Sequence, residues 1–222
     1  MEDVSYFDRI KIYYNIRRED ELASTIVNLI GFGLNTVGMI LLIVFSALKG
    51  NPVQIVSFSI YGAFQIIYCI FSTLYHSFQE TRIKKIFRVF ELSSNYLMLI
   101  GIAIPLSLVA LGGRLGWLFF YLFILLNSVL IVNTILQKHY YQYINYIFNF
   151  LSFITYVVFL VIAYRYFTQA FIIWLGFATL AFLLGLILKE FKGFPFYHAM
   201  SHLFYITANV MLFFGFLFEL VL

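Results

Sequence analysis

Seven apolar runs follow one another along this chain with short polar connections between them, and this pattern constrains the fold more than any other feature. Each run is long enough for a helix that crosses a bilayer, which needs about 20 apolar residues. Hydrophobic residues make up 63% of the sequence and charged residues only 11%, a composition that excludes a soluble globular domain. We therefore expect an all-α membrane protein with seven transmembrane helices. The predicted spans cover residues 22–48, 52–76, 88–111, 115–136, 143–163, 170–188 and 195–221.

The spans divide the 222 residues into a polar lead, residues 1–21, and a single seven-helix domain, residues 22–222. The lead carries both signs of charge and several aromatic residues, so it differs from a cleavable signal peptide and is typical of an interfacial helix. Pro52 and Pro195 fit the first turns of the second and seventh helices, where a missing N–H costs nothing. Pro105 lies inside the third span, where we expect a kink.

The basic residues predict the orientation of the spans, because cytoplasmic connections retain Lys and Arg. Most of the 14 Lys and Arg residues lie in the lead or in connections on the same side as the lead. We therefore expect the N-terminus in the cytoplasm and the C-terminus outside, in a multi-pass protein of the cell membrane. The same distribution accounts for the net charge of +4 without a nucleic-acid partner. The single cysteine, Cys69, excludes an internal disulfide.

Three of the four histidines belong to the apolar runs, where an ionisable residue is costly and indicates function. His198 and His202 are four residues apart and share one face of a helix, and His76 ends the second span. The predicted orientation brings all three to the cytoplasmic half of the membrane. Three imidazoles with an open fourth position are typical of catalytic zinc, so we predict a zinc ion bound by these residues. The alternative is that the histidines are interfacial or hydrogen-bond to one another.

A base and a hydroxyl complete the predicted site. The segment His198–His202 lacks the glutamate of the zincin motif, so a base must come from another helix. Glu91 begins the third span on the same side, and Ser72 lies four residues before His76 on one helix face. We predict that both hold a water beside the metal, with Glu91 as the base. The alternatives are that Glu91 pairs with Arg88 and that Ser72 contributes to helix packing.

These residues resemble the hemolysin III family, the bacterial branch of the progestin and adipoQ receptor family, and the resemblance covers nearly the whole chain from Glu21 onward. The Ser-x-x-x-His and His-x-x-x-His motifs, in this order and spacing, carry most of its specificity. The matching segments are Glu21-Leu22-Ala23-Ser24, Ser72 to Ser77, Phe90 to Leu97 with Gly101 and Pro105 after it, and His198-x-x-x-His202.

The resemblance implies seven helices with a cytoplasmic N-terminus and a zinc ion held by His76, His198 and His202. This sequence departs from the family at two positions: the family usually has Asp where this chain has Glu91, and often a histidine where it has Asn28. Glu is one methylene longer than Asp, so Glu91 can still reach a water beside the zinc, or can displace that water as a ligand. Ligation by Glu91 would fill the open position and argue against hydrolysis.

The resemblance leads to two hypotheses from different classes, because the wider grouping includes alkaline ceramidases. The first is a zinc-dependent intramembrane hydrolase that acts on a lipid amide or ester, with a membrane lipid as the substrate. The second follows the family name: a membrane-perturbing or channel-forming protein in which zinc is structural. The spans favour the first, because they offer few charged residues to line a pore. A third reading, a lipid-sensing receptor, would need a cytoplasmic partner, for which the short connections offer little surface.

Overall fold

The computed structural model describes residues 18–78, 81–136, 141–190 and 195–222, so most of the predicted polar lead lies outside the described residues. The described residues form seven long helices, two of which end in a π-helical segment, and they contain no β-strand. The helices are α2 (Arg18–Leu48), α3 (Pro52–Ser77), α4 (Thr81–Ile104) with η1 (Pro105–Leu111), α5 (Gly113–Leu136), α6 (Tyr141–Ala163), α7 (Gln169–Glu190) and α8 (Tyr197–Phe216) with η2 (Leu217–Val221).

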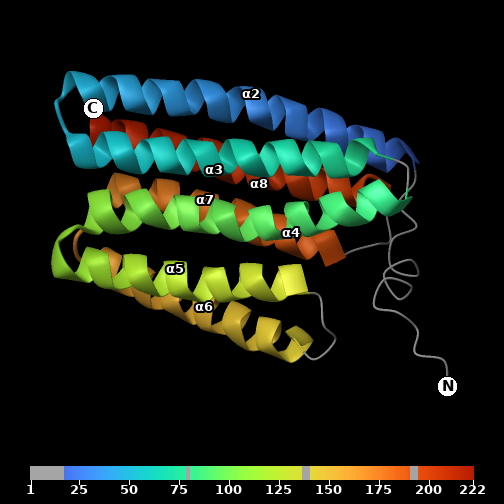
Figure 1. The fold of residues 1–222 in the computed structure, drawn as a ribbon. Coiled ribbons are helices and arrows are strands. Elements are labelled where there is room, and N and C mark those ends of the chain that lie inside the picture. Colours follow the sequence, from blue (N-terminus) through green and yellow to red (C-terminus); the bar gives the residue numbers. More distant parts are fainter. Residues whose placement is uncertain (1–17, 79–80, 137–140, 191–194) are drawn as a thin grey trace.

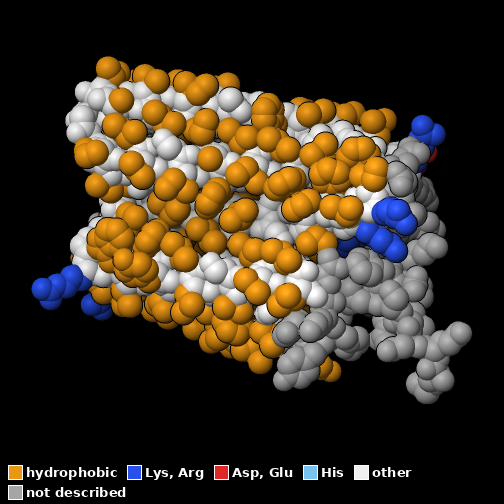
Figure 2. Space-filling model, in the orientation of Figure 1, with side chains coloured by type: hydrophobic (Ala, Val, Ile, Leu, Met, Phe, Trp, Pro, Cys, Tyr) orange, Lys and Arg blue, Asp and Glu red, His pale blue; other side chains and the backbone are white. Residues whose placement is uncertain are grey.

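All seven helices are long and apolar enough to cross a membrane. They lie side by side in one bundle, and α2 begins at the opposite end of the bundle from the last residue (Figure 1). Apolar side chains cover the flank of the bundle, whereas the Lys and Arg side chains visible on this face gather at its two ends (Figure 2). This distribution matches a hydrocarbon layer with water on both sides. The prediction of an all-α protein with seven transmembrane helices is confirmed.

Most helices that are neighbours along the chain pack against one another, and one long-range pairing joins the first described helix to the last. α2 contacts both α3 and α8, α3 contacts α4, and α7 contacts α8. Figure 1 shows α2, α3 and α8 together at one side of the bundle, with α5 and α6 at the other. Three helices that are distant in sequence, α2, α3 and α8, therefore share one interior, and α4 is adjacent to it.

Aromatic side chains fill much of the core. Phe58 of α3 and Phe216 of α8 are fully buried, and their ring centroids are 5.6 Å apart. Tyr61 meets Phe216 edge to face at 5.3 Å, and Phe171 of α7 lies within 6.2 Å of the same ring. Tilted and edge-to-face pairs are the arrangements that aromatic rings favour. This packing lies toward the ends of α3 and α8 that are opposite to the histidines.

The helix beginnings follow their local sequence at α3 and depart from the prediction at α8. Pro52 is the first residue of α3, and the side chain of Asn51 accepts a hydrogen bond from the backbone N–H of Gln54, as an N-cap does. Pro195 was expected to open the last helix, but α8 begins at Tyr197. The prediction is wrong because Phe196 has a left-handed backbone, with φ 62°, which interrupts any helix from Pro195. His198 still lies in the first turn.

The start of α2 and the end of α4 also follow from the residues found there. α2 begins at Arg18, four residues before the predicted span, and its first turn holds Glu19, Asp20 and Glu21, which suit the positive end of a helix dipole. At Pro105 the α-helical pattern of α4 changes to the π-helix η1. Proline has no N–H to donate to the preceding turn, so the hydrogen-bond pattern changes where the sequence predicted an irregularity.

The close approach between η1 and α5 gives a stability prediction. A Cβ atom on Gly116 would lie 2.2 Å from the backbone oxygen of Ser107, which cannot move without distorting η1. We expect Gly116→Ala to destabilise the fold by about 1–3 kcal/mol, as overpacking does. The control is Gly33→Ala in α2, where a Cβ would meet nothing within 4 Å. Thermal unfolding in detergent measures both variants, and equal midpoints would contradict the prediction.

Candidate metal centre

Four buried side chains with metal-binding atoms meet at one end of the bundle. They are His76, Glu91, His198 and His202, and one ligand atom from each lies within 4.8 Å of all the others. Their exposed fractions are 3% or less, so water does not compete freely for these atoms. The structure thus brings together the three predicted metal ligands and the predicted base. Their roles remain predictions.

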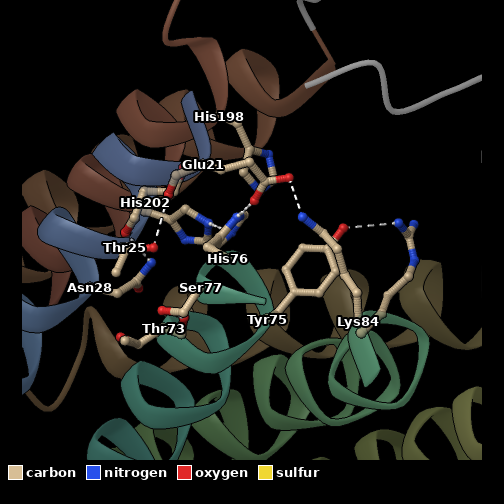
Figure 3. A network of polar contacts seen from close by, with 12 residues as sticks. Glu21, Thr25, Asn28, Thr73, Tyr75, His76, Ser77, Lys84, His198 and His202 are labelled. Atoms are coloured by element: carbon tan, nitrogen blue, oxygen red, sulfur yellow. Dashed lines mark hydrogen bonds and ion pairs between the residues drawn. The ribbon is translucent and has the colours of Figure 1, made fainter. Parts of the chain in front are cut away.

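Three helices supply this group. His76 lies in the last turn of α3, His198 and His202 occupy the first two turns of α8, and Glu91 lies near the middle of α4. The imidazole rings of the three histidines turn toward one another (Figure 3). Their ring centroids are 4.8–5.1 Å apart and each pair meets edge to face. The four-residue spacing in α8 therefore does what the sequence predicted, because it aims both rings at one point.

The distance between two of the histidines fits a tetrahedral metal ion. Nε2 of His76 and Nε2 of His202 are 3.1 Å apart. Two imidazole nitrogens on one zinc ion, each at about 2.0–2.1 Å, are separated by roughly 3.3 Å at the tetrahedral angle. Buried nitrogens that face one another at this distance either share a proton or share a metal ion. The donor set, imidazole with one carboxylate, is one that zinc prefers.

A carboxylate outside this group contacts His76. Nδ1 of His76 lies 2.7 Å from Oε2 of Glu21, and the other oxygen of Glu21 accepts a hydrogen bond from the ammonium group of Lys84. Glu21 belongs to the first turn of α2 and Lys84 to α4, so this network joins three helices (Figure 3). Lys84 also lies over the ring of Tyr75, 5.1 Å from its centroid. Metal-bound histidines commonly have a carboxylate on their second nitrogen.

His202 has a comparable contact on its second nitrogen. Its Nδ1 lies 2.7 Å from the hydroxyl of Tyr68, a fully buried residue of α3. In the tautomer that leaves Nε2 free for a metal, Nδ1 carries the proton and donates it to the phenolic oxygen. Two of the three histidines are thus held by polar groups that direct Nε2 toward the centre of the cluster.

Ser72 lies between Tyr68 and His76 on one face of α3, because the three residues are spaced by four. Its side chain is fully buried. Asn28, at the position where the resemblance often implies a histidine, is also fully buried and donates from its amide to the backbone oxygen of Ser24 at 2.8 Å. An asparagine here keeps a polar group near the cluster but does not add a metal-binding nitrogen.

An apolar groove lies between α2 and α8, and its lining on α8 begins directly after His202 and continues to Val210. It has a volume of about 190 Å³, and one of its residues, Leu203, directly follows His202. A Cβ on Gly31 would lie 2.6 Å from Ile206, so the two helices approach closely beside the groove. The groove is lined by Val27, Ile30, Leu34, Leu203, Ile206, Thr207 and Val210.

Sequence reasoning missed Glu21, Tyr68 and Lys84 as members of this site. Glu21 opens a segment that resembles the family, but as one of three acidic residues in a helix start it gave no indication of a contact with the histidines. Tyr68 carried a signal, because it precedes Ser72 by four residues and therefore shares the face of His76. Lys84 looked like one basic residue among several in a connection, although the structure includes it in α4.

The fold and the cluster together define the class: an integral membrane protein of seven helices with a buried group of three histidines and one carboxylate that can hold a metal ion. The chain belongs to the haemolysin-III related family, whose model matches residues 16–217. The resemblance stated from the motifs is therefore confirmed.

Two curated proteins from bacilli are similar to this chain. "Hemolysin-3" of Bacillus cereus is 33% identical over 99 residues, which are 45% of each chain. "Hemolysin-3 homolog" of Bacillus subtilis (strain 168) is 29% identical over 207 residues, which are 91% of this chain and 95% of the relative. This chain is thus a multi-pass membrane protein with bacterial relatives along nearly its whole length.

Proposed function

We propose that this protein is a zinc-dependent intramembrane hydrolase that cleaves a lipid amide or ester. The observation that carries the proposal is the convergence of His76, His198, His202 and Glu91 within 4.8 Å of one another, all buried, in a membrane-spanning bundle. Buried ionisable groups inside a membrane are costly and mark functional sites. A structural zinc site normally uses four protein ligands, whereas three histidines leave a position for water or substrate.

The three histidines would hold zinc, which on binding supplies a Lewis acid that polarises a carbonyl and makes water more acidic. Glu91 would accept a proton from the attacking water, and its buried Oε1 accepts no hydrogen bond from the described residues. Ser72, one turn before His76, would orient the same water. The water oxygen bonds to the carbonyl carbon, the C–N or C–O bond breaks, and Glu91 returns the proton to the departing amine or alcohol.

The substrate would reach the site from the bilayer. The groove between α2 and α8 begins along α8 directly after His202, and its lining is almost entirely aliphatic. A lipid acyl chain fits such a lining, and contact with Leu203 would hold the carbonyl end of the lipid at the level of the cluster along α8. We place the cluster in the cytoplasmic half of a bacterial plasma membrane, following the distribution of Lys and Arg.

The test is hydrolysis by purified, zinc-loaded protein in lipid vesicles. We expect release of fatty acid from a ceramide or from another bilayer amide or ester, and loss of that release when zinc is removed by a chelator. Mass spectrometry of the extracted lipids measures the released fatty acid and the amine or alcohol that remains. The proposal would be overturned if the zinc-loaded protein left the ceramide and the other bilayer amides and esters intact while an alkaline ceramidase cleaved the ceramide in parallel.

The names of the two relatives favour a second candidate, a protein that permeabilises membranes. Here zinc would stabilise the bundle and take no part in chemistry. The two candidates separate in a dye-leakage assay with vesicles. Leakage that persists in a folded, zinc-free variant, without lipid cleavage by the parent, would support permeabilisation. Intact vesicles with cleaved lipid would support the hydrolase.

A further inference from the structure

We propose that Glu21, held by Lys84, is a positioning residue of the metal centre that fixes the tautomer and the orientation of His76. Nothing in the motif spacing assigns this role, because Glu21 belongs to the first turn of α2, far from His76 in sequence. The inference rests on the metal-binding part of the proposed function and does not require hydrolysis.

The contact with His76 has the geometry of a strong hydrogen bond. Oε2 of Glu21 lies 2.7 Å from Nδ1 of His76, whose side chain is 0% exposed, while that of Glu21 is 17% exposed. A hydrogen bond to a charged acceptor at this distance is about twice as strong as one between neutral groups. Because the imidazole is fully buried, water does not compete for its Nδ1 proton. Glu21 therefore controls the ring of His76 more than solvent does.

The chemistry of the pair sets the tautomer. An ionised carboxylate only accepts hydrogen bonds, so Nδ1 of His76 must carry the proton and Nε2 must present its lone pair. Nε2 is the atom that faces Nε2 of His202 at 3.1 Å. A carboxylate on the distal nitrogen also makes a histidine a stronger metal ligand. Glu21 thus selects the nitrogen that the metal needs and orients its ring.

Lys84 holds Glu21 in this position. Its ammonium group donates to Oε1 of Glu21 while Oε2 remains on His76, so each oxygen has its own partner. The simpler reading is that the Glu21–Lys84 ion pair only joins α2 to α4, with His76 as a bystander. The two interpretations predict different losses of zinc affinity. If the ion pair only joins the helices, changing Lys84 should weaken zinc binding as much as changing Glu21 does.

The experiment compares zinc affinities of the full chain in detergent, measured by competition with a chromophoric chelator. We expect Glu21→Gln to weaken zinc binding about 10- to 100-fold, as loss of such a partner typically does. Lys84→Met keeps the carboxylate but removes the group that holds it on His76, so we expect a smaller loss of zinc affinity, about threefold. Glu21→Asp keeps the charge with a shorter reach and should fall between them. Cobalt substituted for zinc should show a larger shift of its visible absorption spectrum in Glu21→Gln than in Lys84→Met.

Unchanged affinity and cobalt spectrum in Glu21→Gln would overturn the inference, as would equal losses in the Glu21 and Lys84 variants. If Glu21→Gln does not fold, Glu21→Asp decides: a weaker affinity at parental thermal stability supports the inference, and an unchanged affinity overturns it. A parent that binds no zinc overturns both this inference and the proposed function, whereas a zinc-binding parent unaffected at Glu21 overturns this inference alone.

Discussion

Replacement of His198 and His202 by alanine together is expected to abolish zinc binding, from one ion per molecule in the parent to none. The two residues supply two of the three predicted nitrogen ligands, both 2% exposed or less. His76 would then be the only imidazole left in the cluster, and a single imidazole with a carboxylate does not retain zinc against a chelator. Metal analysis of chelator-washed, zinc-reloaded protein measures the stoichiometry.

The double variant must be shown to fold, because it removes two buried side chains that contact each other and His76. Helical circular dichroism and a monodisperse elution profile provide that check. The matched control is His139→Ala, which changes the one histidine that the prediction leaves out of the site. One zinc ion in the parent and in the control, with none in the folded double variant, is the expected pattern. A full zinc content in the folded double variant would show that His198 and His202 do not bind the zinc, and would contradict the prediction.

The second large effect is expected at Glu91, where replacement by glutamine should leave zinc in place and reduce hydrolysis by at least about 100-fold. Glutamine has nearly the same shape as glutamate but cannot accept the proton of the attacking water, and general-base catalysis contributes about 10²–10⁴-fold. Glu91 is 3% exposed, so bulk water cannot easily take over as the base. Rates of lipid cleavage at saturating zinc measure the effect.

Glu91→Asp is the matched variant for this prediction, because the family resemblance has aspartate at this position. It should keep zinc and at least about a tenth of the activity, since the base is retained at a slightly longer distance. If Glu91→Gln instead lost zinc as well as activity, Glu91 would be a fourth ligand. The site would then be closed, and a structural role for zinc would replace the hydrolytic one.

The sequence by itself determined the architecture of this protein. Runs of about 20 apolar residues must satisfy their own backbone hydrogen bonds within a bilayer, and helices do so with local bonds only. The spacing of His198 and His202 is likewise local, because residues four apart on a helix share a face whatever surrounds them. The kinship with the haemolysin-III related family followed from such local motifs and from their order.

Only the tertiary structure decided which distant residues meet. The packing of α2 against α3 and α8 brings Glu21 to His76, and although Glu21 opens a segment that resembles the family, nothing in that segment indicates a contact with a histidine. The left-handed backbone at Phe196, which displaced the start of α8 from Pro195, is likewise invisible to helix propensity. Contacts between helices depend on their order and crossing in the bundle, which the apolar pattern of a single span does not encode. The members of the candidate metal cluster were therefore predictable from local motifs and the order of the spans, whereas the polar groups that contact them emerged from packing.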